Sequence, residues 1–234
     1  MLKEELVQRS PVRVFMNSIH GGLKPGEIGV IASPSGIGKT SVLVQIALDK
    51  LLQGNKIIHV SFTRHNDYVL SWYENIFDEF IKRKNLEDEQ DVKKDIVKNR
   101  VLMRFTQEGV TTEQILRSFK AMIKDGGFNA DTIIVDGFDF SAAEKNHVAL
   151  VRDFAAEMGL CFWYSCNVNG KEPYYDKRSI PLVIKDYADL FNVIIIMDPK
   201  PDHIELKMSR DRDSFNLEHL ALKLDPKTLL ILEG

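Results

Sequence analysis

The sequence predicts an α/β protein whose mainly parallel sheet ends in antiparallel strands. Short apolar runs of strand length alternate with helical patterns through most of the chain, which is the order that βαβ units produce. From residue 203 onward, apolar and polar residues alternate at a period of two, which predicts antiparallel strands. With 234 residues, 44% of them hydrophobic, the chain is long enough for one sizeable core, and we expect a single domain over residues 1–234.

The predicted strands are short apolar runs bounded by glycines, turn residues or charged segments. They comprise residues 27–33, 56–62, 101–105, 132–136, 161–166, 193–197, 203–208, 220–224 and 229–232. The segment Asp225-Pro-Lys separates the last two of them and predicts a turn.

The predicted helices show apolar residues at a spacing of three and four. They comprise residues 39–53, 67–83, 112–124, 144–158 and 183–191. Gly54 is of the type that ends a helix, and Thr112 is of the type that caps a helix N-terminus. The charge-dense residues 84–98 predict a solvated loop or an exposed helix.

Composition and charge argue against several classes of protein. No stretch approaches the ~18 to 20 continuous apolar residues of a membrane span, and the N-terminus lacks an apolar signal segment, so we expect a cytoplasmic protein without a membrane partner. A net charge of −3 gives no sign of general nucleic-acid binding. Cys161 and Cys166 point to opposite faces of one predicted strand, which favours reduced thiols over a disulfide.

Residues 33–40 read Ser-Pro-Ser-Gly-Ile-Gly-Lys-Thr and lie between a predicted strand and a predicted helix. This is the setting of a phosphate-binding loop, in which glycines let successive N–H groups converge on phosphate oxygens at a helix N-terminus. Lys39 is expected to reach the β- and γ-phosphates, and Thr40 to place its hydroxyl on Mg²⁺. The predicted phosphate-binding residues are Ser33, Pro34, Ser35, Gly36, Ile37, Gly38, Lys39, Thr40 and Ser41.

The first position of this motif, where glycine is expected, holds Ser33. Serine is small, and we expect the loop to tolerate it. The alternative for the whole segment is a glycine-bearing strand–helix turn that binds nothing. The order Gly-Ile-Gly-Lys-Thr in this setting favours phosphate binding over that alternative.

Asp136 ends the apolar strand Thr132-Ile-Ile-Val and matches a Walker B element. In an open α/β sheet the ligand lies beyond the carboxyl ends of the strands. Asp136 is therefore expected near Thr40, where the two residues would hold Mg²⁺ for a bound ATP. The alternative is an aspartate that only opens the turn before Gly137, and the phosphate loop upstream favours the metal role.

The segment Gly21-Gly-Leu-Lys-Pro-Gly-Glu27 directly precedes the first strand. Together with the phosphate loop and Asp136 it resembles the RecA-type ATPase core, most closely that of KaiC-like proteins and DnaB-type helicases. The resemblance covers about residues 13–230. It implies a RecA-like P-loop NTPase fold, with a twisted, mainly parallel sheet flanked by helices and C-terminal antiparallel strands. It also implies a homo-oligomer, such as a hexameric ring or a filament, with ATP at subunit interfaces.

In that family a glutamate after the second strand acts as general base in ATP hydrolysis, a role that needs a carboxylate. The resemblance aligns Thr63 with this glutamate, and the next carboxylate downstream is Asp67. His65 is an alternative base because histidine titrates near neutrality, although a lone loop histidine is more often a surface polar group. The resemblance thus implies ATP binding with slow or absent hydrolysis.

The resemblance also assigns roles to residues farther along the chain. Asn167 is aligned with a polar residue that senses the γ-phosphate, its alternative being a strand-end asparagine that satisfies its own turn. Arg210 and Arg212 resemble a cationic pair that helicase-type relatives insert into the neighbouring subunit's site, where it stabilises charge on the transferred phosphoryl group. Lys207 competes for this role, and a surface turn held by ion pairs is the remaining alternative.

The loop over residues 169–181 has the position of the family's DNA-contacting loop. It combines cations for phosphates with aromatic rings for base stacking, the two requirements of single-strand binding. These residues are Lys171, Tyr174, Tyr175, Lys177 and Arg178. Two acidic residues dilute the charge, so single-stranded DNA as a partner and a solvated lid remain open.

Four functions are consistent with these patterns. The first is an ATP-binding domain that acts as a weak Mg²⁺-dependent ATPase in an oligomer. The second is a pseudo-ATPase that serves as a nucleotide-regulated interaction module, which Thr63 favours. The third is a DNA-dependent, helicase-like motor. A P-loop kinase or small-molecule transferase fits less well, because the Gly-Gly-Leu lead-in and the C-terminal strands resemble a RecA-type core.

Overall fold

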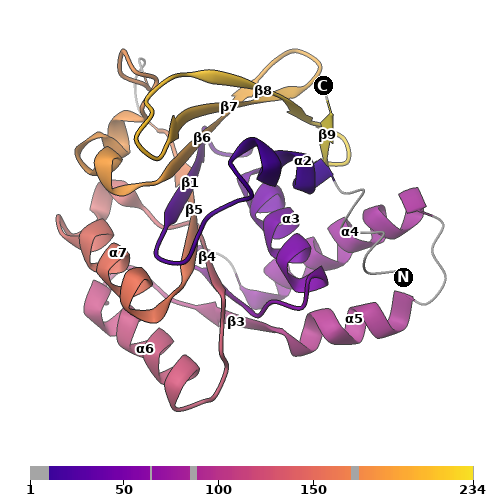
Figure 1. Cartoon of the computed structure of the whole chain (residues 1–234), viewed down its shortest axis with the longest axis vertical. Coiled ribbons are helices and arrows are strands. Elements are labelled where there is room, and N and C mark those ends of the chain that lie inside the picture. Colours follow the sequence, from indigo (N-terminus) through magenta and orange to yellow (C-terminus); the bar gives the residue numbers. More distant parts are fainter. Residues whose placement is uncertain (1–10, 64, 85–88, 170–173, 234) are drawn as a thin grey trace.

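The computed structural model describes residues 11–63, 65–84, 89–169 and 174–233. In this part of the chain a nine-stranded sheet has the order β3-β2-β4-β5-β1-β6-β7-β8-β9. The strands from β3 to β6 in this order pair in parallel, and β6 to β9 pair antiparallel. The α/β class, with a mostly parallel sheet flanked by helices and an antiparallel C-terminal extension, is thereby confirmed (Figure 1).

The described strands are β1 Ile28–Ser33, β2 Ile57–Ser61, β3 Arg100–Arg104, β4 Thr132–Asp136, β5 Cys161–Asn167, β6 Val193–Pro199, β7 Ile204–Asp211, β8 Glu218–Leu224 and β9 Ile231–Glu233. The described α-helices are α2 Pro11–Ser18, α3 Lys39–Leu52, α4 Asn66–Lys84, α5 Glu89–Lys98, α6 Thr112–Lys124 and α7 His147–Met158. Two 3₁₀ segments, η1 Phe140–Ala142 and η2 Leu182–Leu190, complete the order. None of the described helices is long and apolar enough to cross a membrane.

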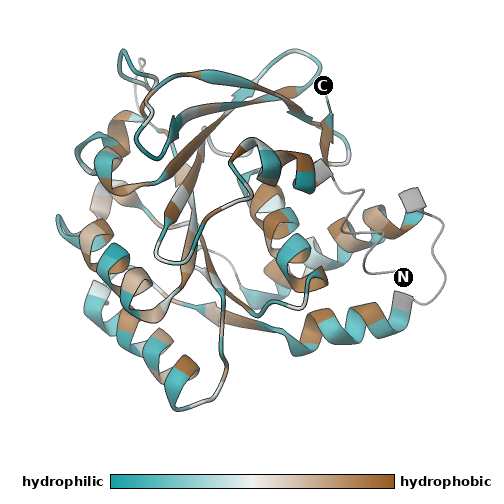
Figure 2. Ribbon diagram, viewed as in Figure 1, coloured by the Kyte–Doolittle hydropathy of each residue, from teal (hydrophilic) through white to brown (hydrophobic). Residues whose placement is uncertain are grey.

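Two apolar layers lie on opposite faces of the sheet. Helix α3 packs between the sheet and helices α2, α4 and α5, while α6, α7 and η2 cover the other face (Figure 1). Apolar residues gather on the strands and on the helix faces turned toward them (Figure 2). Cys161 belongs to one layer and Cys166 to the other, and both thiols are free, as the strand period predicted.

The parallel strands bring polar residues to one edge of the sheet. Ser33 at the end of β1 pairs with Asn167 at the end of β5, and Ser61 at the end of β2 pairs with Asp136 at the end of β4. Helix α3 begins at this same edge, directly after the loop that follows β1. The edge is therefore where the sequence predicts a ligand, beyond the carboxyl ends of the parallel strands.

Two local expectations need correction, and one helix was not expected. Helix α5 is not simply exposed, because Val92 and Ile96 on one of its faces are buried in the layer around α3. Thr111 rather than Thr112 caps α6, and its side chain forms a capping box with Gln114. Helix α2 was not predicted at all, although its apolar face lies in the core.

Candidate functional site

The predicted phosphate loop adopts a conformation that needs its glycines. Gly36 has φ 82° and Gly38 has φ 102°, values that side chains with a Cβ rarely adopt. Gly38 precedes the first residue of α3, and a Cβ added there would lie 2.8 Å from Leu224 Cδ2. The loop thus turns sharply into the N-terminus of α3, where free N–H groups and the helix dipole favour an anion.

Lys39, the lysine of this loop, is folded back onto the end of β1. Its Nζ donates to the carbonyl oxygens of Ser33 (3.0 Å) and Pro34 (2.8 Å) and to Ser33 Oγ (3.1 Å). The side chain is only 8% exposed. Burial lowers the pKa of Lys39 to about 8, and the nearby negative charge of Asp136 opposes this shift only in part.

Asp136 connects the loop to the neighbouring strands. Thr40 Oγ1 donates to Asp136 Oδ2 at 2.8 Å, and Ser165 Oγ donates to Asp136 Oδ1 at 2.7 Å. Ser165 Oγ in turn accepts the backbone N–H of Gly137 at 2.8 Å. The structure therefore brings Thr40 and Asp136 together, as the two motifs predicted. The structure adds Ser165 to this group, a residue to which the sequence analysis gave no role. The available signal was the position of Ser165 near the polar end of a buried strand.

A cavity of about 250 Å³ lies over this edge of the sheet. It brings together residues of the phosphate loop, the strand ends and helix α4. The described residues that line it are Ser35, Gly36, Gly38, Lys39, Thr40, Thr63, Tyr68, Trp72, Asp136, Gly137, Ser165, Asn167 and Leu229. Among them Asp136 is the only carboxylate, so the described wall offers one acidic group.

Thr63 lies at the cavity where the resemblance implies a glutamate. Its side chain is exposed, and a Cβ added to Gly137 would lie 2.6 Å from Thr63 Oγ1. Gly137 thus leaves room for Thr63 beside Asp136. His65, the alternative base, is exposed and is not among the described residues that line the cavity.

Two aromatic residues of α4 form a wall of the cavity that the sequence did not point to. Tyr68 and Trp72 line it, with their rings edge to face at a centroid distance of 6.2 Å. Their spacing of four on a helix places them on one face. That spacing was the available signal, but it is equally typical of residues that pack in a core.

Several predicted phosphate-loop residues are placed elsewhere than at the cavity. Ser41 is fully buried and its Oγ donates to the carbonyl oxygen of Leu229 at 2.6 Å, an oxygen that Gln45 Nε2 also reaches at 2.9 Å. Ser41 thus fastens the C-terminal segment to α3. The other predicted residues that do not line the cavity are Ser33, Pro34 and Ile37.

Arg210 and Arg212 are not brought to the cavity. Because β7 runs antiparallel to β6, Arg210 lies opposite Ile194, near the start of β6. This end of the strand is the one away from the cavity. Arg210 NH1 donates to Ala188 O at 2.8 Å and its guanidinium lies 4.1 Å from the Phe215 ring centre. Arg212 donates to both carboxylate oxygens of Glu27 at 3.0 Å. Both side chains have partners inside this chain, and the role in a neighbouring subunit stays a prediction.

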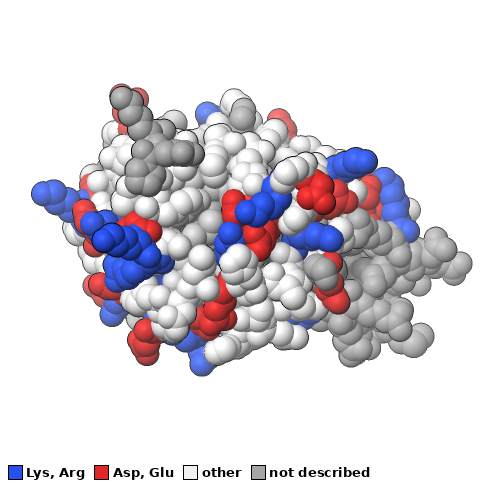
Figure 3. All heavy atoms as spheres, turned by 90° about the horizontal axis from the view of Figure 1, so that it is seen from above, with Lys and Arg blue, Asp and Glu red and all other residues white. Residues whose placement is uncertain are grey.

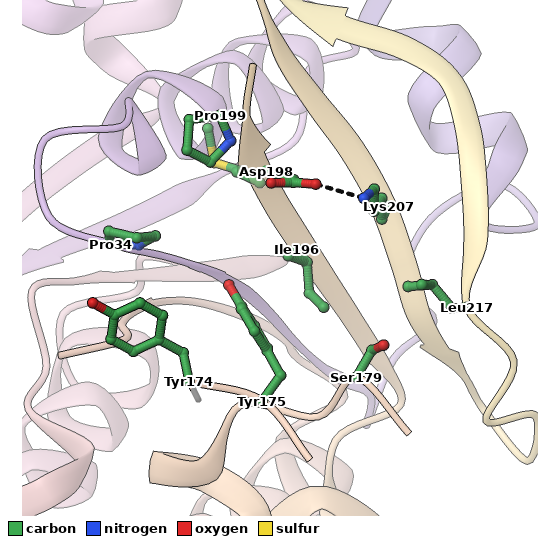
Figure 4. Close-up of a pocket in the computed structure, with 10 residues that line it drawn as sticks. Pro34, Tyr174, Tyr175, Ser179, Ile196, Asp198, Pro199, Lys207 and Leu217 are labelled. Carbon is green, nitrogen blue, oxygen red and sulfur yellow. Dashed lines mark hydrogen bonds and ion pairs between the residues drawn. The ribbon is translucent and has the colours of Figure 1, made fainter. Parts of the chain in front are cut away.

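Lys207, the competing cation, lies in a second and larger groove of about 790 Å³. Its Nζ bonds to Asp198, and Tyr174 and Tyr175 of the 169–181 loop line the same groove together with Pro34 (Figure 4). Part of this loop, residues 170–173 with Lys171 among them, lies outside the described residues.

Of the two cations in the described part of the loop, Lys177 is exposed, whereas Arg178 has partners within the chain. Arg178 pairs with Asp176 at 3.6 Å and lies over the ring of Phe215 at 4.8 Å. On the face seen from above, basic and acidic side chains are intermingled (Figure 3). Single-stranded DNA as a partner stays a prediction.

Comparison with known proteins does not assign a function. No protein-family model matches the chain, and no curated protein matches it. The geometry itself combines a buried lysine, a threonine hydroxyl, an aspartate and a glycine-rich helix N-terminus around one cavity. This set is chemically suited to hold a phosphorylated ligand together with a divalent cation.

Proposed function

We propose that this chain binds ATP with Mg²⁺ through the phosphate loop and Asp136, as a RecA-type domain that acts in an oligomer. The observation that carries the proposal is the 2.8 Å hydrogen bond between Thr40 Oγ1 and Asp136 Oδ2, which joins residues 96 positions apart at the cavity. The parallel strands by themselves bring both positions to this edge, but they do not require a threonine and an aspartate there. A phosphate loop and its metal-holding aspartate do.

The residues present fit Mg²⁺, which prefers oxygen ligands in octahedral geometry and keeps several waters. Thr40 Oγ1 and an oxygen of Asp136 would hold it, the carboxylate through water. When bound, the ion would neutralise charge on the β- and γ-phosphates. Lys39 would leave its carbonyl partners to contact the same phosphates.

The RecA-type assignment is supported by the lead-in as well as by the loop. Glu27 closes the Gly-Gly-Leu-Lys-Pro-Gly-Glu segment and is held by Arg212, whose NH2 also donates to Gly22 O at 3.0 Å. This pairing anchors the lead-in, which with the phosphate loop most resembles a RecA-type core, to the end of β7. Slow hydrolysis is the expected activity, since the described cavity wall offers no second carboxylate to activate water.

A second candidate function is a pseudo-ATPase, a nucleotide-binding switch without turnover. Thr63 favours it, because a threonine hydroxyl at the cavity cannot take a proton from water at neutral pH. In that case nucleotide binding itself would regulate contact with a partner. Wild-type ATP turnover above that of an Asp136→Asn variant would exclude this candidate.

Replacing Thr40 by Val is expected to remove the Mg²⁺ dependence of ATP binding. Valine keeps the shape of threonine but has no oxygen for the ion. Calorimetric titration with ATP should show binding that Mg²⁺ strengthens in the wild type, and about tenfold weaker binding of Mg²⁺·ATP in the variant.

The matched control is Thr132→Val, a buried threonine at the opposite end of β4 from Asp136. It should bind Mg²⁺·ATP as the wild type does. Equal Mg²⁺ dependence in Thr40→Val and the wild type would contradict the proposed ion site.

A further inference from the structure

Ser33 departs from the phosphate-loop motif, and its side chain contacts the lysine of that motif. Ser33 is fully buried, and its Oγ lies 3.1 Å from Lys39 Nζ. We propose that Ser33 is a positioning residue that holds the ammonium group of Lys39 at the end of β1, away from a bound phosphate, and so weakens nucleotide binding. The proposal rests on the proposed function of Lys39 as a phosphate ligand.

The hydrogen-bond directions around Ser33 favour this role. A serine hydroxyl has one proton, and Ser33 Oγ donates it to the carbonyl oxygen of Pro34 at 3.0 Å. Its lone pairs are therefore free to accept from Lys39 Nζ. With the carbonyl oxygens of Ser33 and Pro34, the ammonium group has three acceptors, which matches its three protons.

A glycine at position 33 would lack this third acceptor. The backbone there does not require glycine either, because Ser33 is not among the described residues with positive φ, unlike Gly36 and Gly38. Ser33 instead continues β1, where it pairs with Asn167. The side chain at this position is thus accommodated without strain and adds a contact that holds the lysine.

The contact is also reversible, because the acceptors keep partners when the lysine leaves. Ser33 O accepts the N–H of Val168 at 3.0 Å, and Pro34 O accepts the hydroxyl of Ser33. No buried carbonyl of this set would be left without a hydrogen bond. Lys39 can therefore exchange between the retracted position and a bound phosphate, and the hydroxyl of Ser33 favours the retracted one.

The test uses Ser33→Ala, which removes the hydroxyl but keeps Cβ. The first readout needs no nucleotide: labelling of Lys39 by trinitrobenzenesulfonate in the ligand-free protein, followed by mass spectrometry. We expect labelling to be several-fold faster in the variant, because Lys39 leaves its buried position more often. The second readout is the affinity for ATP, which we expect to rise by about tenfold, the value of one hydrogen bond to a charged group.

The matched control is Ser209→Ala, a fully buried strand serine on β7 whose Oγ donates to Ile194 O at 3.4 Å. It should leave both readouts unchanged. Ser33→Gly, which restores the motif, should shift both readouts in the same direction as Ser33→Ala and serves as the second variant if alanine impairs folding.

The outcomes separate this inference from the proposed function. Unchanged or slower labelling of Lys39 in both Ser33 variants would overturn the inference, whether or not ATP binds. Faster labelling with weaker ATP binding would also overturn it, since Ser33 would then be a phosphate ligand. If the Ser33 variants are labelled faster than the wild type, but neither they nor the wild type binds ATP, the retracted position of Lys39 is supported and the proposed function is rejected.

Discussion

Replacing Lys39 by Met is expected to weaken ATP binding by about a hundredfold while making the ligand-free protein more stable at pH 7. The loss of affinity follows from removing a cation whose hydrogen bonds to phosphate oxygens are charge-assisted. The gain in stability follows from burial. Lys39 is 8% exposed and contacts carbonyl and hydroxyl oxygens rather than a carboxylate, so its charge is only partly compensated.

The pH dependence of this gain has a defined sign. The pKa of Lys39 falls from its usual 10.5 to about 8 in the folded chain, because burial disfavours the charged form. Between these values the unfolded chain binds more protons than the folded one, so wild-type stability rises with pH. Below pH 8 the full penalty applies, and it is on the order of 3 kcal/mol.

Urea denaturation at pH 7 and pH 10 measures this effect. The unfolding free energy of Lys39→Met should exceed that of the wild type at pH 7, and the difference should shrink at pH 10. Lys120→Met is the matched control, because Lys120 is exposed and pairs with Glu157 on the surface. A Lys39→Met variant that binds ATP as well as the wild type would remove Lys39 from the site.

Replacing Thr63 by Glu is expected to raise ATP turnover by about 10²- to 10⁴-fold, the usual contribution of a general base. Thr63 is exposed and lines the cavity beside Gly137, so a carboxylate at this position would face the place where the γ-phosphate is expected. Phosphate release at saturating Mg²⁺·ATP is the measurement.

Thr63→Gln is the matched control, since glutamine has the size of glutamate but cannot accept the proton. It should bind ATP and turn it over no faster than the wild type. If Thr63→Glu binds ATP yet remains as slow as Thr63→Gln, the missing base is not what limits hydrolysis.

The sequence predicted the contact between Thr40 and Asp136 because Thr40 ends the phosphate-loop motif and Asp136 ends an apolar strand. Parallel strands bring the ends of these two segments to the same edge of the sheet. It did not predict the use of Ser41, whose hydroxyl is taken by the carbonyl oxygen of a residue 188 positions away. Such a contact depends on where the C-terminal segment packs against α3, and no spacing within the motif carries that information.

Elements whose burial depends on tertiary packing were also harder to predict. Helix α5 is dense in charge, yet Val92 and Ile96 pack against the layer around α3. Three apolar residues in ten, of which Val97 is exposed, do not distinguish a packed face from an exposed helix. The partners of Arg210 and Arg212 also depend on tertiary packing. Their sequence resembled a cationic pair directed outward, whereas Ala188, Asp189 and Glu27 lie within reach only once the sheet has formed.

The most direct measurement of the central claim is the electron paramagnetic resonance of Mn²⁺, used in place of Mg²⁺ and titrated with the protein in the presence of ATP. The proposed site predicts that adding wild-type protein lowers the Mn²⁺ signal amplitude below that of Mn²⁺ with ATP alone. Adding the Asp136→Asn variant should leave the amplitude at the level of Mn²⁺ with ATP alone. A signal that wild type and Asp136→Asn change equally, or that neither changes, would contradict a nucleotide-bound metal at Thr40 and Asp136.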